Sequence, residues 1–128
     1  MKAIILAAGV GRRLGGGPDH RPKALLAFGP STLLERHLRL LRGFGITGIA
    51  VTVGYRADLI AAEVGCLGLA GSVRLIDNPH HRDGSVVSLW AAREILTSGA
   101  PVLLMDADVL YDRRLLARLL DSPPDNIL

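Results

Sequence analysis

Short apolar runs alternate along the chain with longer segments in which apolar residues recur every three or four positions. Continuous apolar runs suit strands buried on both faces, and the longer spacing suits amphipathic helices. The predicted strands are residues 3–8, 49–53, 73–76 and 102–105. The predicted helices begin near residues 32, 57, 85 and 112. This order predicts an α/β fold, a Rossmann-like three-layer sandwich with a mostly parallel sheet.

Local signals refine this outline. Thr32 is followed three residues later by Glu35, which is the spacing of a capping box, and Asp112 can cap the last helix. Residues 9–30 are rich in glycine and proline and are expected to form a loop. The helix over residues 85–96 is expected to bury its larger apolar side chains, which are Val86, Leu89, Trp90 and Ile95.

Composition limits the classes of function. The 128 residues are 49% hydrophobic and 21% charged, which suits one compact domain. The net charge of +3 comes with scattered arginines and 4% aromatic residues, so an anionic small molecule is favoured over nucleic acid. The single cysteine excludes an internal disulfide and favours a cytoplasmic location. No segment approaches membrane-spanning length, so no membrane insertion is expected.

Unusual residues follow three of the four predicted strands. Glycines follow the first, residues 78–88 follow the third, and two aspartates follow the fourth. Ligands of parallel α/β sheets bind at the carboxyl ends of the strands. These segments are therefore the candidate binding site.

The segment after the first strand begins Gly9-Val10-Gly11. Glycines at such a point let backbone N–H groups approach a bound anion. The third glycine of a dinucleotide-binding loop is absent, and so is the lysine of a Walker loop. Arg13 and Lys23 flank the segment. They are either cations for a bound triphosphate or solvated surface charges.

Asp106 and Asp108 end the fourth strand and would face the same side of an extended backbone. Two neighbouring carboxylates suit Mg²⁺, which also takes phosphate oxygens. Alternatively, one of them is a turn or cap residue. Gly84 and Ser85 start a helix, where they present N–H groups and a hydroxyl to a ligand or serve only as a cap.

Two stretches together resemble a known family. Residues 3–14, followed by residues 22–26, are similar to the motif L-A-A-G-x-G-x-R-L, a spacer and P-K of the nucleotidyltransferases that act on sugar-1-phosphates and alcohol phosphates. The resemblance implies a glycosyltransferase-A-like nucleotidyltransferase fold. Residues 1–128 would be the nucleotide-binding, N-terminal part of a single such domain, truncated after the fourth β-α unit.

The resemblance also implies roles for individual residues. Lys23 and Arg13 would contact the phosphates, and Asp108 would hold Mg²⁺ with Asp106 as its companion. The residues expected to line the nucleotide are Leu6, Ala7, Ala8, Gly9, Gly11, Asn78, Gly84 and Ser85. Ser88-Leu89 resembles the choline-phosphate-type cytidylyltransferases and favours CTP, although Gly84-Ser85 departs from the usual asparagine pair of that branch.

The function implied is Mg²⁺-dependent transfer of a nucleoside monophosphate, CMP being favoured, from a nucleoside triphosphate to a small phosphorylated or phosphonate acceptor, with release of pyrophosphate. One alternative is a sugar-1-phosphate uridylyl- or thymidylyltransferase. Another is a molybdenum-cofactor nucleotidyltransferase, whose R-M-G-x-D-K pattern is missing here. A non-catalytic nucleotide-binding regulatory subunit would not need Lys23 and Asp108. The oligomeric state stays open, a homo-oligomer included.

Overall fold

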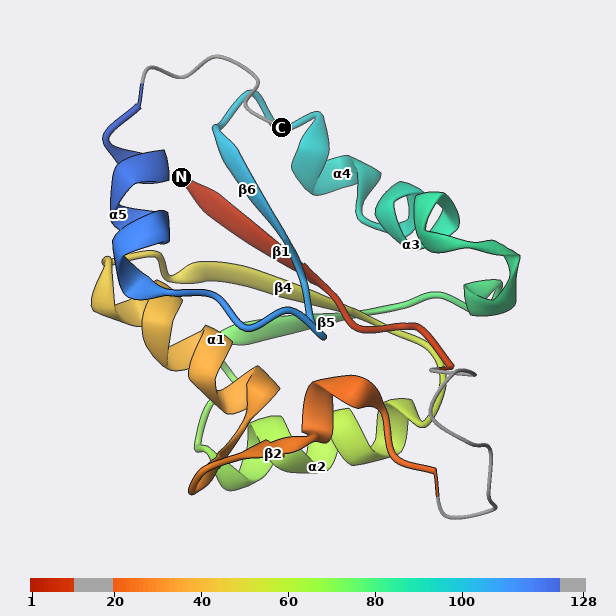
Figure 1. The fold of residues 1–128 in the computed structure, drawn as a ribbon. Coiled ribbons are helices and arrows are strands. Elements are labelled where there is room, and N and C mark those ends of the chain that lie inside the picture. The colour runs from red at the N-terminus through yellow and green to blue at the C-terminus, as the bar shows by residue number, and fades with distance from the viewer. Residues whose placement is uncertain (11–19, 123–128) are drawn as a thin grey trace.

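The central sheet of the protein consists of four parallel strands. The computed structural model describes residues 1–10 and 20–122. The strands are β1 (Lys2–Leu6), β4 (Gly48–Val53), β5 (Val73–Asp77) and β6 (Val102–Asp106). Their order is β5-β4-β1-β6, so the first strand of the chain lies inside the sheet (Figure 1). All four predicted strands are confirmed, and the largest difference is that the first ends at Leu6.

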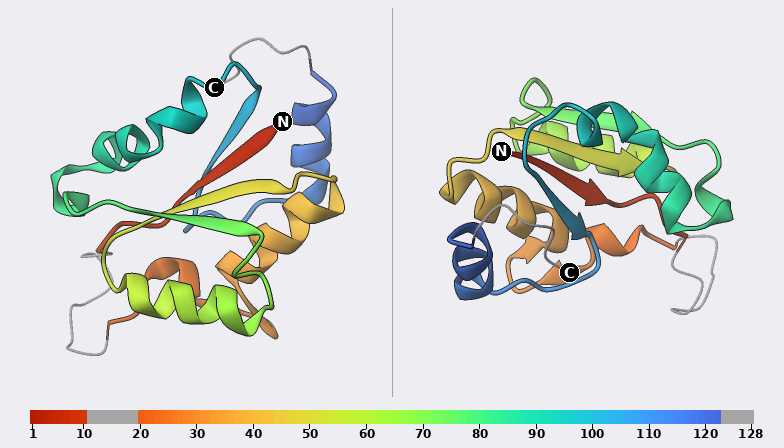
Figure 2. Two further views of the ribbon diagram at one scale, coloured as in Figure 1. Left: turned by 180° about the vertical axis from the view of Figure 1, so that it is seen from behind. Right: turned by 90° about the horizontal axis from the view of Figure 1, so that it is seen from above.

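Helices cover both faces of this sheet, which confirms the three-layer arrangement (Figures 1 and 2). One face carries α1 (Leu33–Gly43), α2 (Ala57–Cys66) and α5 (Arg113–Leu120), and the other carries α3 (Ser85–Ala91) and α4 (Arg93–Leu96). Within the described ranges, no helix is long and apolar enough to cross a bilayer.

The two apolar cores follow the pleat of β1. Ala3 and Ile5 belong to the larger core, which includes Leu34 and Leu38 of α1. Ile4 points the other way, into a smaller core with Ala92, between α3 and α4, and Ile95 of α4. Alternate side chains of a strand face opposite sides of its sheet, so a continuous apolar run is what a strand covered on both faces requires.

The start of α1 is fixed by Thr32. Its Oγ1 accepts a hydrogen bond from the Glu35 N–H at 3.1 Å and donates to Oε1 of Glu63 on α2 at 2.7 Å. The Glu35 carboxylate pairs with Arg39 instead of reaching back to Thr32, so half of the predicted capping box forms. The same logic holds at α5, where Asp112 accepts from the Arg114 N–H at 2.7 Å.

The segment predicted as a loop before α1 is partly structured. It contains a 3₁₀ helix, Lys23–Leu25, and a short antiparallel hairpin of β2 (Ala27–Phe28) and β3 (Ser31–Thr32). Ala24 and Leu25 are buried, which anchors the 3₁₀ helix on the core. The lysine at its start is therefore held at a defined position.

The predicted helix over residues 85–96 is interrupted at Ala92, and its predicted burial is wrong in part. Ile95 is buried, but Val86 is 76% exposed and Trp90 is 66% exposed. The residues that face the sheet are Ser88, Ala92 and Ile95. Their spacing of four and three residues is that of one helical face, so Trp90 lies off that face, against the Arg93 guanidinium.

Candidate active site

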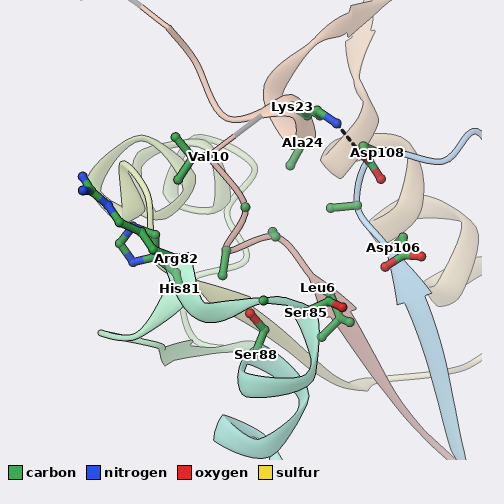
Figure 3. Close-up of a pocket in the computed structure, with 15 residues that line it drawn as sticks. Leu6, Val10, Lys23, Ala24, His81, Arg82, Ser85, Ser88, Asp106 and Asp108 are labelled. Carbon is green, nitrogen blue, oxygen red and sulfur yellow. Dashed lines mark hydrogen bonds and ion pairs between the residues drawn. The ribbon is translucent and has the colours of Figure 1, made fainter. Parts of the chain in front are cut away.

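A pocket of about 340 Å³ lies beyond the carboxyl ends of the strands. Four segments line it, within residues 6–10, 23–24, 81–88 and 106–108. Figure 3 shows Lys23 and Asp108 on one side of this pocket, with His81 and Ser88 on another. Segments that are distant in sequence meet here because parallel strands bring their carboxyl ends to the same edge of the sheet.

The first wall is the end of β1 and the residues after it. Leu6, Ala7, Ala8 and Gly9 all line the pocket. The Ala7 N–H donates to Thr52 at 2.9 Å, and the Ala8 carbonyl accepts from Tyr55 at 3.3 Å. Among the described residues, the N–H groups of Gly9 and Val10 have no hydrogen-bond partner. They are available to an anion.

Gly11 and Arg13, which were expected to continue this wall, lie outside the described residues.

The acidic pair, Asp106 and Asp108, lies at the end of β6, which flanks β1 on the side away from β4. The Ala107 N–H donates to the Leu6 carbonyl at 3.0 Å, but Ala107 and Asp108 already belong to a turn, in which the Val109 N–H donates to the Asp106 carbonyl at 3.5 Å. Ala107 is buried, while Asp106 and Asp108 are exposed and line the pocket. Both carboxylates reach the pocket, but the extended backbone that the sequence prediction assumed ends at Asp106, and Asp108 is a turn residue.

Asp108 is also an ion-pair partner. Its Oδ2 accepts from Nζ of Lys23 at 2.9 Å, and both side chains are only partly exposed (Figure 3). A lysine and a carboxylate at one edge of a pocket can contact a phosphate and its counter-cation together.

Two carboxylates suit Mg²⁺, which takes other ligands from substrate and water, better than they suit a metal ion whose ligands all come from the protein. Among the described residues, no group of three or more His, Cys, Asp or Glu side chains could hold a metal ion. Mg²⁺ commonly takes one or two carboxylates and completes its shell with substrate phosphates and water. Asp106 and Asp108 supply that number of carboxylates beside free N–H groups.

The second wall is the segment between β5 and α3, and Asn78 supports it from behind. Asn78 was expected to contact the nucleotide, but it is 2% exposed and does not line the pocket. Its Nδ2 donates to Ser88 Oγ at 3.0 Å, and its Oδ1 accepts from the His80 N–H at 3.0 Å. Because Ser88 Oγ accepts this bond, the Ser88 hydroxyl proton is free to donate into the pocket.

Gly84 and Ser85 line the pocket as expected from the sequence. Gly84 has φ +112°, a conformation that side chains with a Cβ rarely adopt. It leads directly into the first turn of α3, so the turn that brings Ser85 to the pocket depends on a glycine at this position.

His81 and Arg82 also line the pocket and were not among the candidate residues. His81 packs against the end of β4, where a Cβ added to Gly54 would lie 2.5 Å from the His81 Cβ. A glycine directly after a predicted strand can mark a close approach by another segment. Gly54 could therefore have indicated such a contact, but the sequence does not identify His81 as the residue that approaches.

The rings of His37 and Tyr111 support the backbone that carries the acidic pair, residues 106–109. The Asp106 N–H donates to the Tyr111 hydroxyl at 2.9 Å, and Nε2 of His37 donates to the Val109 carbonyl at 2.7 Å. The two rings meet edge to face with centroids 5.3 Å apart. Burial lowers the pKa of His37 and raises the pKa of Tyr111, so both stay neutral at neutral pH.

Several known proteins are similar in sequence to this chain. The bifunctional IPC transferase and DIPP synthase of Rubrobacter xylanophilus is 39% identical over 81% of this chain and 23% of its own length. The choline-phosphate cytidylyltransferase of Streptococcus pneumoniae is 35% identical over 84% of this chain and 44% of its own. The chain thus spans less than half of either relative.

A solved structure shares the fold. The CTP:phosphocholine cytidylyltransferase from Streptococcus pneumoniae superposes with a TM-score of 0.74 and 34% identity, covering 88% of this chain and 47% of that one. The family model described as the MobA-like NTP transferase domain matches residues 3–127. With the glycine segment, the lysine and the acidic pair around one pocket, this match shows that the chain belongs to the MobA-like NTP transferase family.

Proposed function

We propose that the pocket binds a nucleoside triphosphate, with CTP preferred, and that the chain supplies the nucleotide half of a site that transfers CMP to a small phosphorylated or phosphonate acceptor. The observation that carries the proposal is the composition of one pocket. It combines the N–H groups of Gly9 and Val10, which have no partner in the described part of the chain, with the Lys23 ammonium and the carboxylates of Asp106 and Asp108.

The reaction asks the protein to position and stabilise phosphates. An acceptor oxygen attacks the α-phosphorus, the bond between that phosphorus and the bridging oxygen breaks, and pyrophosphate leaves with the bonding electrons. The Gly9 and Val10 N–H groups and Lys23 would offset the charge that develops on the leaving phosphates. Arg13 is proposed to act beside them.

Asp106 and Asp108 would hold Mg²⁺ against the phosphates. When bound, Mg²⁺ supplies Lewis-acid stabilisation of phosphate charge. Asp108 holds Lys23 in the free protein, so nucleotide and cation binding would release this lysine toward a phosphate oxygen. The protein offers the reaction two carboxylates and a lysine, and no protein nucleophile is needed.

The preference for CTP rests on the relatives. The choline-phosphate cytidylyltransferase of Streptococcus pneumoniae is similar to this chain, and so is the solved structure of a CTP:phosphocholine cytidylyltransferase from the same organism. The second wall also supplies the Ser88 hydroxyl as a donor, from which the O2 atom of cytosine or of uracil could accept. Gly84 and Ser85 would complete the contacts to base and ribose.

The test is calorimetric titration of the chain with CTP, UTP, dTTP, GTP and ATP, each with and without Mg²⁺. We expect Mg²⁺-dependent binding that is tightest for CTP. Asp108→Asn is expected to weaken it by at least about tenfold, since a charge-assisted ligand contact contributes roughly 1.5–3 kcal/mol.

Asp77→Asn is the matched control. Asp77 is an exposed carboxylate at the end of β5 that does not line the pocket, so the same loss of charge leaves the pocket intact. A folded chain that binds no nucleotide, or that loses equal affinity with either substitution, would contradict the proposal. Release of pyrophosphate on adding phosphocholine to the CTP complex would extend it to turnover.

A further inference from the structure

A second hollow, lined in part by residues that follow Asp108, is separate from the pocket proposed above to bind the nucleotide, which we call the nucleotide pocket. Its volume is about 380 Å³, and it lies between α1, the turn before β3 and the segment that leads into α5. The two hollows share no lining residue. The polar side chains that line the second one are Ser31, Arg36, His37, Arg39, Tyr111 and Arg113. We call it the arginine pocket.

The charge of the arginine pocket is strongly one-sided. Three arginines line it, and no aspartate or glutamate does. Arg39 is offset by Glu35 of the preceding helical turn. Among the described residues, neither Arg36 nor Arg113 forms an ion pair with a carboxylate. The pocket therefore keeps an excess of positive charge.

Arg36 and Arg113 are held by aromatic rings instead. The guanidinium carbon of Arg36 lies 5.0 Å from the Phe28 ring centroid, and that of Arg113 lies 4.7 Å from the Phe44 centroid. A ring face orients a guanidinium without cancelling its charge. Two arginines are thus ordered before any ligand arrives, and their N–H edges remain free to bind oxygen.

Planar guanidinium groups bind phosphate oxygens through paired N–H bonds. Arg36 and Arg113 at one hollow suit a compact anion with several charges. A ligand with a single carboxylate would offset only part of their positive charge. We propose that the arginine pocket is a second anion site, which binds the diphosphate group of a small molecule. The source is either free pyrophosphate or a nucleoside diphosphate, and both present the same oxygens.

Pyrophosphate titration by calorimetry tests this proposal, with Lys23→Gln as the parent to weaken binding in the nucleotide pocket. Arg36→Gln/Arg113→Gln is then added. We expect the parent to bind pyrophosphate and the arginine variant to bind at least about tenfold more weakly, from the loss of charge-assisted bonds. Far-UV circular dichroism and thermal unfolding establish that each variant is folded.

Arg42→Gln/Arg118→Gln is the matched control. It removes one charge from each of the same two helices at exposed positions outside both pockets. Binding should change by less than about twofold, because exposed charges at this distance are largely screened by salt. If the double variant fails to fold, Arg113→Gln alone carries the test by the same criterion.

Three results would overturn the proposal: no pyrophosphate binding by the parent, equal binding by the arginine variant, or an equal loss in the control. Repeating the titration with CDP separates the two sources. Tighter binding of CDP that depends on Arg36 and Arg113 assigns the pocket to a nucleotide, and equal binding assigns it to the diphosphate group alone. Neither result depends on whether CTP binds the nucleotide pocket.

Discussion

Lys23 and Asp108 are 85 residues apart in the chain, and their side chains form an ion pair of 2.9 Å at the edge of the nucleotide pocket. Both are partly exposed, so water screens the pair and its contribution to stability is small. A contact that contributes little to folding and stands beside a pocket is better explained by ligand binding. Substitution of Lys23 separates a role in stability from a role in ligand binding.

Lys23→Gln should lower the free energy of unfolding by less than about 1 kcal/mol, the range of exposed ion pairs. It should weaken nucleoside triphosphate binding by about tenfold, since a charged phosphate contact is lost. Urea unfolding and calorimetry measure the two effects. Lys2→Gln, which alters the only other lysine at the far end of β1, should leave binding unchanged.

Asn78→Ala should destabilise the protein by about 1–3 kcal/mol, because the His80 N–H and the Ser88 hydroxyl each lose a partner. The wall that carries Ser88 should loosen, so nucleotide binding should weaken without the loss of a ligand contact. Chemical denaturation with parallel titrations checks both effects. Unchanged stability would show that Asn78 does not support this wall.

Gly54→Ala should displace His81, since the new Cβ would lie 2.5 Å from the His81 Cβ. Overpacking of this kind costs about 1–3 kcal/mol. Gly65→Ala is the control, because Gly65 lies in α2 with open space around it and alanine favours a helix by about 0.5–1 kcal/mol. Thermal unfolding should therefore move in opposite directions for the two variants.

His37 should make stability depend on pH. Its pKa lies below the ordinary value of 6.5, chiefly because burial disfavours the charged ring, although the hydrogen bond to Val109 opposes this and Arg36 adds to it. The unfolded chain therefore binds this proton at a higher pH than the folded one. The stabilisation is fully present above pH 6.5 and is lost as the pH falls toward the pKa of the folded state.

His37→Gln, which keeps an N–H donor near Val109, should flatten that pH dependence of the unfolding free energy. His80→Gln, at an exposed histidine, should leave it as in the wild type. Urea unfolding at a series of pH values from 5 to 8 measures the slopes. A His37 variant with an unaltered slope would assign the dependence to other groups.

The sheet and the helix caps could be predicted because their signals are local. A strand covered by helices on both faces leaves a continuous apolar run, as in residues 3–6. Asp106 and Asp108 also flank a buried alanine, but the turn after Asp106, and not the period of two along a strand, brings Asp108 to the pocket. Thr32 and Asp112 cap their helices through bonds that span only two or three residues.

The features that escaped prediction depend on contacts between distant segments. Asn78 looks like a pocket residue after a strand, but its hydrogen bond to Ser88 ten residues later turns it inward. The apolar residues of α3 surround the helix, so only the approach of the sheet decides that Ser88 is buried and Trp90 is not. His37 lies on the same helical face as Leu34 and Leu38, but the sequence does not show that Val109, 72 residues away, supplies its acceptor.

The strand order has a consequence for the growing chain. β1 is synthesised before both of its neighbours, because one of its edges pairs with residues 48–52 and the other with residues 102–106. Until β6 leaves the ribosome, that second edge of β1 has no partner, and unpaired edges invite contacts with other chains. The glycine segment after β1 is thus made before the acidic pair at the end of β6, which follows about a hundred residues later.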